Sequence, residues 1–241
     1  MVATSKYSTV LFDIGGVVSS SPLLAIAAYE KENQIKPGYI NFCIAHTLHG
    51  AFHKLETNEM EMNERFYHDF KADLENKEQW TKYHGDYLKA IPVLDAKALF
   101  WRMMEVSREI DPLMAKAIGM LKEHGFRVAA LTNNYIFPKN SAEYEAFAAN
   151  DDGSLRNLFD FYFESVKLGI RKPDVRIFRR VAKEMNVAMS DIVFLDDIGS
   201  NLKAAKGLGM KVIRVHIGKT QDALGELEAI LGVDLMSKPS L

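Results

Sequence analysis

This sequence has a single cysteine and almost no net charge. Each of these features excludes some classes of site or partner. Cys43 is the only cysteine among 241 residues, which excludes a disulfide within the chain and a cysteine-rich metal site. Lysine and arginine total 30 against 32 aspartate and glutamate residues, so the formal net charge is -2. This balance provides neither a basic field for nucleic acid nor a polybasic face for a membrane. We therefore expect neither as a partner.

Long apolar segments are missing as well. No apolar run reaches the roughly 18 residues that span a bilayer, and residues 1–8 lack the apolar core of a signal peptide. Together with the single cysteine, this favours a reducing, cytoplasmic location. With 48% hydrophobic and 26% charged residues, the composition is that of a globular protein, with room for one large domain or for a core and a smaller second domain.

Four short apolar runs organise the rest of the chain. They cover residues 9–12, 127–131, 192–195 and 211–215, and polar residues or glycines follow each of them. Helical patterns lie between the last three runs. Continuous apolar runs that alternate with helices are typical of a buried parallel sheet. We therefore predict an α/β fold: a Rossmann-like, doubly wound parallel sheet with helices on both faces.

Residues 20–109 have a different pattern, because helical periodicities follow one another there without an apolar strand run between them. We predict a helical cap at residues 20–109, inserted into an α/β core that residues 1–19 and 110–241 form. One cap helix is expected to follow a capping box of Asn58 and Glu61. Its apolar stripe consists of residues four positions apart: Met62, Phe66, Phe70 and Leu74.

Polar residues gather where the predicted strands end. Asp13 and two glycines end the first run, Thr132 and two asparagines end the second, and Asp196 and Asp197 end the third. In open α/β sheets, ligands bind beyond the carboxyl ends of the strands, and glycines there let backbone N–H groups approach an anion. Each segment alone is also an ordinary turn sequence, so the indication comes from their combination.

A carboxylate pair at the end of a buried strand points to a metal. Asp196 and Asp197 would repel each other, which makes a purely structural role costly unless a divalent cation is bound. Mg²⁺ prefers a few carboxylates together with water and phosphate oxygens, and Asp13 with this pair supplies such a set. Lys172, just ahead of a proline that begins a helix, is suited to hold a phosphate.

Four segments resemble, in order, the four motifs of the haloacid dehalogenase-like superfamily. They are FDIGGV at residues 12–17, LTNN at residues 131–134, RKPD at residues 171–174 and FLDDIGSNL at residues 194–202. These segments are particularly similar to those of the N-terminal phosphatase domain of soluble epoxide hydrolases, and to those of the related domain ahead of some acyl-CoA dehydrogenase-like proteins. The likeness covers nearly the whole chain, although the cap matches only in helical character and position.

The resemblance implies a Mg²⁺-dependent hydrolase of a small phosphorylated metabolite, acting on phosphate monoesters. Asp13 would attack phosphorus and become an aspartyl phosphate. Thr132 and Asn133, with the backbone of Gly16, would hold the phosphoryl oxygens, and Lys172 would balance the charge between nucleophile and phosphate. Phosphoryl transfer depends mainly on positioning and charge neutralisation, which such groups supply.

The metal ligands implied by the resemblance are Asp13, the backbone carbonyl of Gly15 and Asp197, with Asp196 supporting the metal's waters. Gly15 is also a departure from the family pattern, which usually has a second aspartate at this position as general acid and base. The backbone carbonyl is retained, but proton transfer loses its usual donor, and one such group typically contributes about 10²- to 10⁴-fold.

Three interpretations therefore stay open at the level of sequence: an active phosphatase, a catalytically weak domain that binds a phosphoryl ligand or regulates, and a dehalogenase that needs no metal. A substitute acid from the cap is also considered. His46, His49 and His53 have the three- and four-residue spacing of one helix face, which is either a catalytic group or simply a solvated or partly buried face. Zinc binding by these histidines is disfavoured, because no further ligands have the required spacing.

Overall fold

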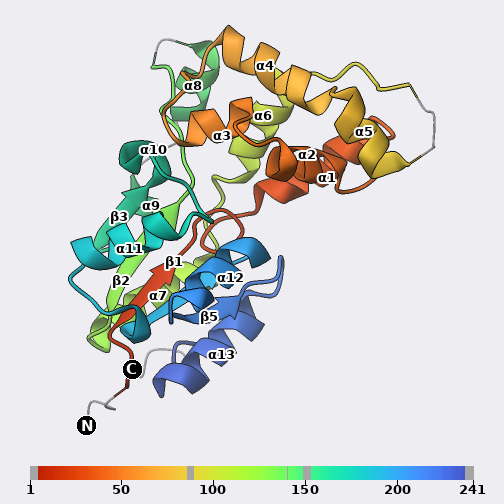
Figure 1. The fold of residues 1–241 in the computed structure, drawn as a ribbon. Coiled ribbons are helices and arrows are strands. Elements are labelled where there is room, and N and C mark those ends of the chain that lie inside the picture. The colour runs from red at the N-terminus through yellow and green to blue at the C-terminus, as the bar shows by residue number, and fades with distance from the viewer. Residues whose placement is uncertain (1–4, 86–89, 140, 149–152, 237–241) are drawn as a thin grey trace.

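The computed structural model describes residues 5–85, 90–139, 141–148 and 153–236, and its centre is a five-stranded parallel sheet (Figure 1). The strand order is β3-β2-β1-β4-β5. The predicted Rossmann-like, doubly wound fold with an inserted helical cap is confirmed, and each of the four apolar runs forms a strand. The strands are β1 (Thr9–Phe12), β2 (Arg127–Thr132), β3 (Phe161–Glu164), β4 (Ile192–Asp196) and β5 (Lys211–Arg214).

Strand β3 was not predicted. It has four residues, lies at the edge of the sheet beside β2, and leaves its first two side chains half-buried. A short edge strand of this kind carries little of the apolar signal that marks the buried strands. Its pairing of Glu164 with Thr132 nevertheless brings a polar side chain to the same sheet edge as the predicted site.

Helices cover both faces of the sheet because alternate strand residues point to opposite sides. Val10 and Phe12 pack on one face with α7 (Pro112–Glu123) and α13 (Thr220–Leu231). Leu11 packs on the other face with α11 (Val175–Glu184) and α12 (Gly199–Gly207). Short connecting helices complete this lobe: α9 (Ser154–Asn157), α10 (Ser165–Leu168) and a 3₁₀ turn, η1 (Met189–Asp191).

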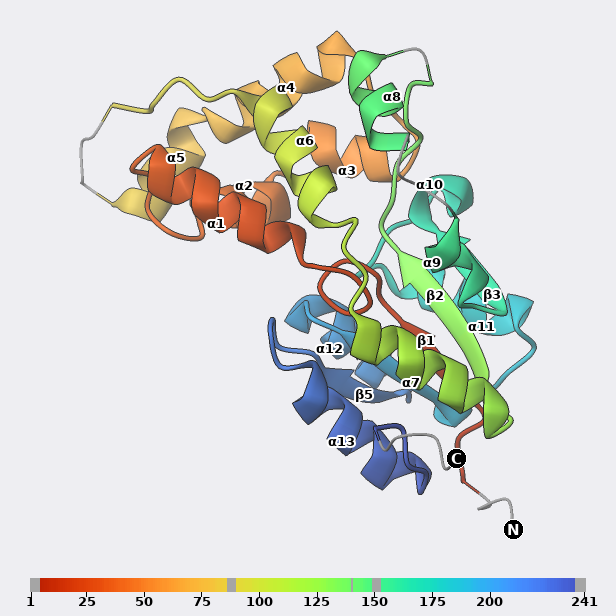
Figure 2. The same ribbon diagram turned by 180° about the vertical axis from the view of Figure 1, so that it is seen from behind.

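Six helices form a second lobe over the carboxyl edge of the sheet (Figures 1 and 2). They are α1 (Pro22–Glu32), α2 (Tyr39–His46), α3 (Ala51–Glu56), α4 (Glu64–Leu74), α5 (Lys77–His84) and α6 (Ala96–Val106). This lobe has its own buried cluster, which is rich in aromatic rings. The two chain segments that join the lobes run side by side, with a bridge between Ser19 and Ile110.

The predicted capping box is wrong. Helix α4 begins at Glu64, and the side chain of Asn63 caps it by accepting hydrogen bonds from the N–H groups of Arg65 and Phe66. Asn58 instead has a positive φ of 62°, in the turn that follows α3. The pattern of Asn58 and Glu61 therefore belongs to that turn, and the helical stripe begins at Phe66.

The sequence of residues 135–158, rich in alanine, asparagine and aspartate, predicts an extended surface connection with a short helix at residues 142–149. The helix is present as α8 (Ala142–Ala148), while residue 149 lies outside the described residues. It packs on the cap lobe: the rings of Phe137 and Phe147 lie 6.0 and 6.1 Å from that of Trp101. Within the described residues, no helix is long and apolar enough to cross a membrane.

Candidate active site

Parallel pairing places two acidic strand ends next to each other. In the register of β1 and β4, Phe12 is the partner of Leu195, so Asp13 and Asp196 follow side by side at the carboxyl edge. Asp197 comes one residue later. One carboxylate oxygen from each of Asp13, Asp196 and Asp197 lies within 4.8 Å of the others. The three carboxylates predicted from the sequence to act together therefore form one cluster.

Lys172 is the cation of this cluster. Its Nζ lies 2.7 Å from Asp13 Oδ1 and 2.9 Å from Asp196 Oδ2, and its side chain is 1% exposed. Burial alone lowers the pKa of Lys172, but the two carboxylates outweigh it and raise that pKa, so the side chain stays charged. A buried lysine without such partners would be strongly destabilising.

The amide of Asn133 holds the backbone of Lys172 from both sides. Asn133 Oδ1 accepts from the Lys172 N–H at 2.9 Å, and Asn133 Nδ2 donates to the Lys172 carbonyl at 3.1 Å. The structure thus uses this side chain to position the lysine, and a phosphate contact from Asn133 stays a prediction. Thr132 is buried at the end of β2, and its hydroxyl makes only a long contact of 3.4 Å to the Asn133 carbonyl.

Asp196 and Asp197 differ in the hydrogen bonds that their carboxylate oxygens accept. Asp196 is fully buried and accepts from Lys172, from the Ile198 N–H at 2.8 Å and from Asn201 Nδ2 at 3.0 and 3.1 Å. Asp197 Oδ1 is buried and has no hydrogen-bond partner among the described residues. Burial, followed by the charge of Asp196, raises the pKa of Asp197 to about 6. Asp197 Oδ1 is therefore available as a ligand for a cation.

The charge balance of the site fits a divalent cation. Three carboxylates and one ammonium group leave two negative charges in a buried space. Burial, together with Asp196 and Asp197, raises the pKa of Asp13 well above its usual range, although Lys172 opposes this shift. A divalent cation would neutralise the remaining charge and give Asp197 Oδ1 a partner, so the donor set suits a hard, oxygen-preferring metal.

A tight loop after β1 brings the backbone close to Asp197. The Ile14 carbonyl accepts from the N–H groups of three following residues, Val17, Val18 and Ser19. Gly16 has a φ of +85°, and a Cβ there would lie 2.4 Å from Asp197 Oδ2, so only glycine fits. The N–H of Gly16 donates to the Ser19 carbonyl at 2.7 Å, and its predicted phosphate contact stays a prediction.

The backbone conformation of Gly15 is less restrictive than that of Gly16. Its φ lies outside the left-handed region, and a Cβ there would meet Pro22 Cδ at 3.2 Å, which requires a small displacement. The backbone therefore tolerates the carboxyl group that this position lacks. A metal contact from the Gly15 carbonyl stays a prediction.

Sequence analysis assigned no role to several residues that support the site. Asn201, which holds Asp196, stands in the first turn of the helix after β4, and this spacing of five residues is a signal that could have identified it. Glu164 and Ser165 hold Asn134: its Nδ2 donates to Glu164 Oε1 at 3.0 Å, and its N–H donates to Ser165 Oγ at 2.9 Å. Glu164 ends the unpredicted strand β3 and Ser165 follows it, so no sequence signal pointed to them.

The prediction that three histidines share one helix face is wrong. His46 ends α2 with its ring stacked on Phe42, His49 lies in the following turn with a φ of 58°, and His53 belongs to α3. Gly50, which precedes α3, and the turn before it break the helical spacing. Burial, followed by the charge of Arg171, lowers the pKa of His53 to about 4, so its ring is neutral near pH 7.

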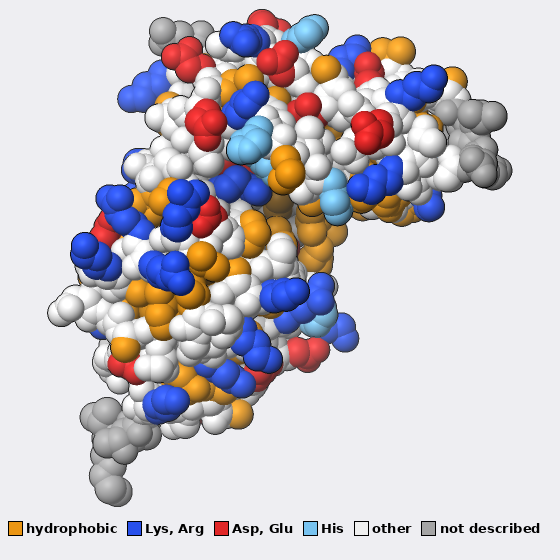
Figure 3. All heavy atoms as spheres, in the orientation of Figure 1, with side chains coloured by type: hydrophobic (Ala, Val, Ile, Leu, Met, Phe, Trp, Pro, Cys, Tyr) orange, Lys and Arg blue, Asp and Glu red, His pale blue; other side chains and the backbone are white. Residues whose placement is uncertain are grey.

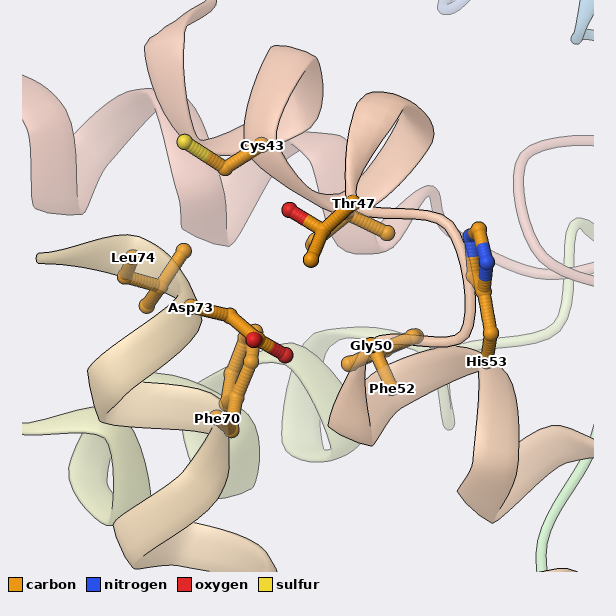
Figure 4. Close-up of a pocket in the computed structure, with 9 residues that line it drawn as sticks. Cys43, Thr47, Gly50, Phe52, His53, Phe70, Asp73 and Leu74 are labelled. Carbon is orange, nitrogen blue, oxygen red and sulfur yellow. The ribbon is translucent and has the colours of Figure 1, made fainter. Parts of the chain in front are cut away.

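A cavity in the cap is too small for a substrate. Its volume is about 10 Å³, which matches a single water molecule. The Thr47 hydroxyl and the Asp73 carboxylate face it in Figure 4, with Cys43 and His53 on its wall. At the larger scale of Figure 3, apolar side chains are exposed in the hollow where the two lobes meet, near the carboxyl edge of the sheet.

The chain matches the haloacid dehalogenase-like hydrolase family over residues 7–209. It therefore belongs to this family of hydrolases, and the resemblance found in the four motifs is confirmed. Acyl-CoA dehydrogenase family member 10 from Mus musculus is 32% identical over 95% of this chain and 20% of that protein. Bifunctional epoxide hydrolase 2 from Sus scrofa is 36% identical over 56% of this chain and 23% of that protein. The chain thus spans about a fifth of the length of these relatives.

Among solved structures, a HAD family enzyme from Bacteroides thetaiotaomicron, in complex with magnesium and inorganic phosphate, superimposes with a TM-score of 0.56. The match covers 88% of this chain and 96% of that one at 17% identity. At this identity the likeness concerns the fold alone.

Proposed function

We propose that this protein is a Mg²⁺-dependent hydrolase of small phosphate monoesters that works through an aspartyl phosphate at Asp13. The observation that carries the proposal is the buried cluster of three carboxylates and Lys172, which keeps two uncompensated negative charges and one carboxylate oxygen without a partner. A divalent cation and a phosphoryl group complete such a site. The solved relative that holds magnesium and inorganic phosphate on the same fold supports this choice.

Asp13 is suited to be the nucleophile. Ile14 N–H and Lys172 both contact Oδ1, and among the described residues no donor lies at Oδ2, so Oδ2 is free to attack phosphorus. Lys172 would hold the carboxylate in place and share the charge of the phosphoryl group, while the Thr132 hydroxyl would donate to a phosphoryl oxygen. Mg²⁺, held by Asp13, Asp197 and the Gly15 carbonyl, would neutralise the negative oxygens.

Attack by Oδ2 would form the Asp13–phosphorus bond as the bond to the leaving oxygen breaks. Water would then cleave the aspartyl phosphate, releasing inorganic phosphate and restoring the Asp13 carboxylate. The absence of a carboxyl group at Gly15 keeps a second candidate: a domain that binds a phosphoryl ligand and turns over at most once.

The test is hydrolysis of p-nitrophenyl phosphate by the purified protein with Mg²⁺. We expect many turnovers per protein molecule, loss of activity with a chelator, and a decrease of at least about 10⁴-fold in Asp13→Asn, the scale of removing a nucleophile. Asp222→Asn, on an exposed helix turn, is the matched control and should behave as wild type. Product that stops at one equivalent would favour the binding domain, and metal-independent halide release from a 2-haloacid would favour a dehalogenase.

A further inference from the structure

The proposed function leaves one chemical step without a residue. When the bond between phosphorus and the leaving oxygen breaks, an alkoxide needs a proton, and Gly15 has no carboxyl group to supply it. His53 is neutral near pH 7, because its pKa is lowered to about 4 by burial and by Arg171. Glu56 reaches the junction of the lobes from the cap, but its carboxylate is paired with the guanidinium of Arg171. The remaining candidate proton donor that we consider at this junction is the hydroxyl of Tyr135.

The backbone of Tyr135 is fixed to the site. It directly follows the LTNN segment, and its N–H donates to Asn134 Oδ1 at 2.8 Å. Asn134 is in turn held by Ser165, and Asn133 holds the backbone of Lys172. The loop that positions the lysine therefore also positions the backbone of Tyr135.

The side chain of Tyr135 lies between the site and the cap. Its ring packs edge-on against Phe52 at 5.7 Å and against Phe100 at 5.4 Å, both in the cap cluster. Phe52 and Glu56 stand one turn apart on α3, so the ring also lies near the Glu56–Arg171 pair at the junction of the lobes. Among the described residues the hydroxyl has no hydrogen-bond partner, so packing accounts for the position of the ring and leaves the hydroxyl free.

The protonation state of this hydroxyl suits a donor. Burial, followed by the charge of Glu56, raises the pKa of Tyr135 well above its usual range, and Arg171 opposes this. The group is therefore protonated at neutral pH. An alkoxide is more basic still than a phenolate, so transfer of the proton to a leaving alkoxide is favourable, and Arg171 is nearby to stabilise the phenolate that results.

We propose that the Tyr135 hydroxyl donates a proton to the leaving-group oxygen and so replaces the carboxyl group that is absent at Gly15. As Asp13 bonds to phosphorus and the phosphorus–oxygen bond breaks, the leaving oxygen takes the Tyr135 proton and departs as an alcohol. In the second step the phenolate takes a proton from the attacking water. The Asp13–phosphorus bond breaks, inorganic phosphate leaves, and both residues return to their starting state.

The experiment compares two probes, p-nitrophenyl phosphate and ethyl phosphate, with the full chain and Mg²⁺. The nitrophenolate leaves without a proton, whereas ethoxide does not. Tyr135→Phe keeps the ring and should lower kcat for ethyl phosphate by about 10²-fold or more, with little change for the aryl ester, since this is the scale of one positioned acid. Gly15→Asp in the Tyr135→Phe background should restore hydrolysis of ethyl phosphate.

Tyr67→Phe and Glu56→Gln are the controls. Tyr67 belongs to the same cap cluster, and its hydroxyl accepts from Trp101 Nε1 at 3.0 Å, so its loss should lower the melting temperature without changing the ratio of the two esters. Glu56→Gln tests the other acid at the junction and should not slow ethyl phosphate relative to the aryl ester, because loss of the Glu56 charge removes one cause of the raised pKa of Tyr135. Tyr135→Phe should melt like wild type, because its hydroxyl makes no hydrogen bond that folding would lose.

Three results would overturn the inference while the proposed function stands. They are an unchanged ester ratio in Tyr135→Phe, a selective loss of ethyl phosphate hydrolysis in Glu56→Gln instead, and a wild-type protein that hydrolyses the aryl ester but not ethyl phosphate. A wild-type protein that hydrolyses neither ester would overturn the proposed function and this inference together.

Discussion

The two lobes concentrate different kinds of buried side chain, although the cap also buries Glu30 and Glu56. The core buries charge: Lys172, Asp13 and Asp196 lie below the surface at the ends of strands, and each has a partner of opposite charge. The cap buries aromatic rings, such as those of Phe66 and Phe100, whose centroids are 5.3 Å apart in an edge-on arrangement. Charged contacts require fixed geometry, whereas apolar packing tolerates substitution as long as volume is kept.

Under the proposed function, this difference would separate chemistry from selectivity. The sheet would hold the reacting groups, and the cap cluster, which tolerates substitution, would shape the space above them. The lobes meet through a few polar contacts. Ser165 Oγ donates to the Glu56 carbonyl at 2.7 Å, and the Glu56 carboxylate pairs with Arg171, the residue before Lys172. The following changes test how far the two lobes act independently.

The largest effect is expected from removing a ring from each lobe. Phe66 in the cap and Phe178 in the core are both fully buried, so Phe66→Ala and Phe178→Ala should each lower the free energy of unfolding by about 3–5 kcal/mol. Phe178 packs on Phe194 of β4, the strand that carries Asp196, at 5.4 Å. We therefore expect weaker Mg²⁺ binding in Phe178→Ala alone. Calorimetric titration of both variants is the measurement, and weakened binding in Phe66→Ala as well would show that the lobes are coupled.

The next effect concerns the metal. Mg²⁺ at a hundredfold excess over its Kd should stabilise the protein by about 2.7 kcal/mol, seen as a higher melting temperature. Asp197→Asn should abolish this gain, whereas Asp222→Asn should retain it. Equal stabilisation by Mg²⁺ in Asp197→Asn would remove this residue from the metal site.

The same titration has a defined pH dependence. The pKa of Asp197 is about 6 in the folded protein against 3.8 for the free group, so the metal-free native state holds a proton that the unfolded state has lost. The metal-free protein should therefore lose stability as pH rises from about 4 to 6. Mg²⁺ competes with that proton, so its stabilising effect should be small at about pH 5 and complete above about pH 7. A stabilisation that does not vary over this range would contradict the assignment.

The smallest effect is expected at the contact between the lobes. Ser165 is fully buried, and Ser165→Ala removes its hydrogen bonds to the Glu56 carbonyl and the Asn134 N–H, at a net cost of about 0.5–1.5 kcal/mol for each bond. Thermal melting should show the loss, with Ser190→Ala on the surface as control. Because Asn134 stands beside Asn133 and Tyr135, KM should rise as well. A variant that melts like the control would mean that other contacts suffice to hold the cap.

The sequence alone determined the family, the parallel sheet and the acidic strand ends. These follow from local order: an apolar run predicts a buried strand, and parallel strands bring their carboxyl ends to one edge. The sequence therefore predicts that Asp13, Asp196 and Asp197 lie together, and they do. The roles assigned to them stay predictions that the experiments above address.

Only the tertiary structure decided which partner each side chain at that edge of the sheet contacts. Asn133 holds Lys172 across 39 positions of the chain, and Asn201 donates to Asp196, whereas Asp197 Oδ1 has no hydrogen-bond partner among the described residues. Tyr135 comes to lie under the cap for the same kind of reason, through contacts with rings more than thirty positions away. Spacing along the chain specifies neither the direction of a side chain nor its distant partner, because both depend on packing that forms only when the lobes fold together.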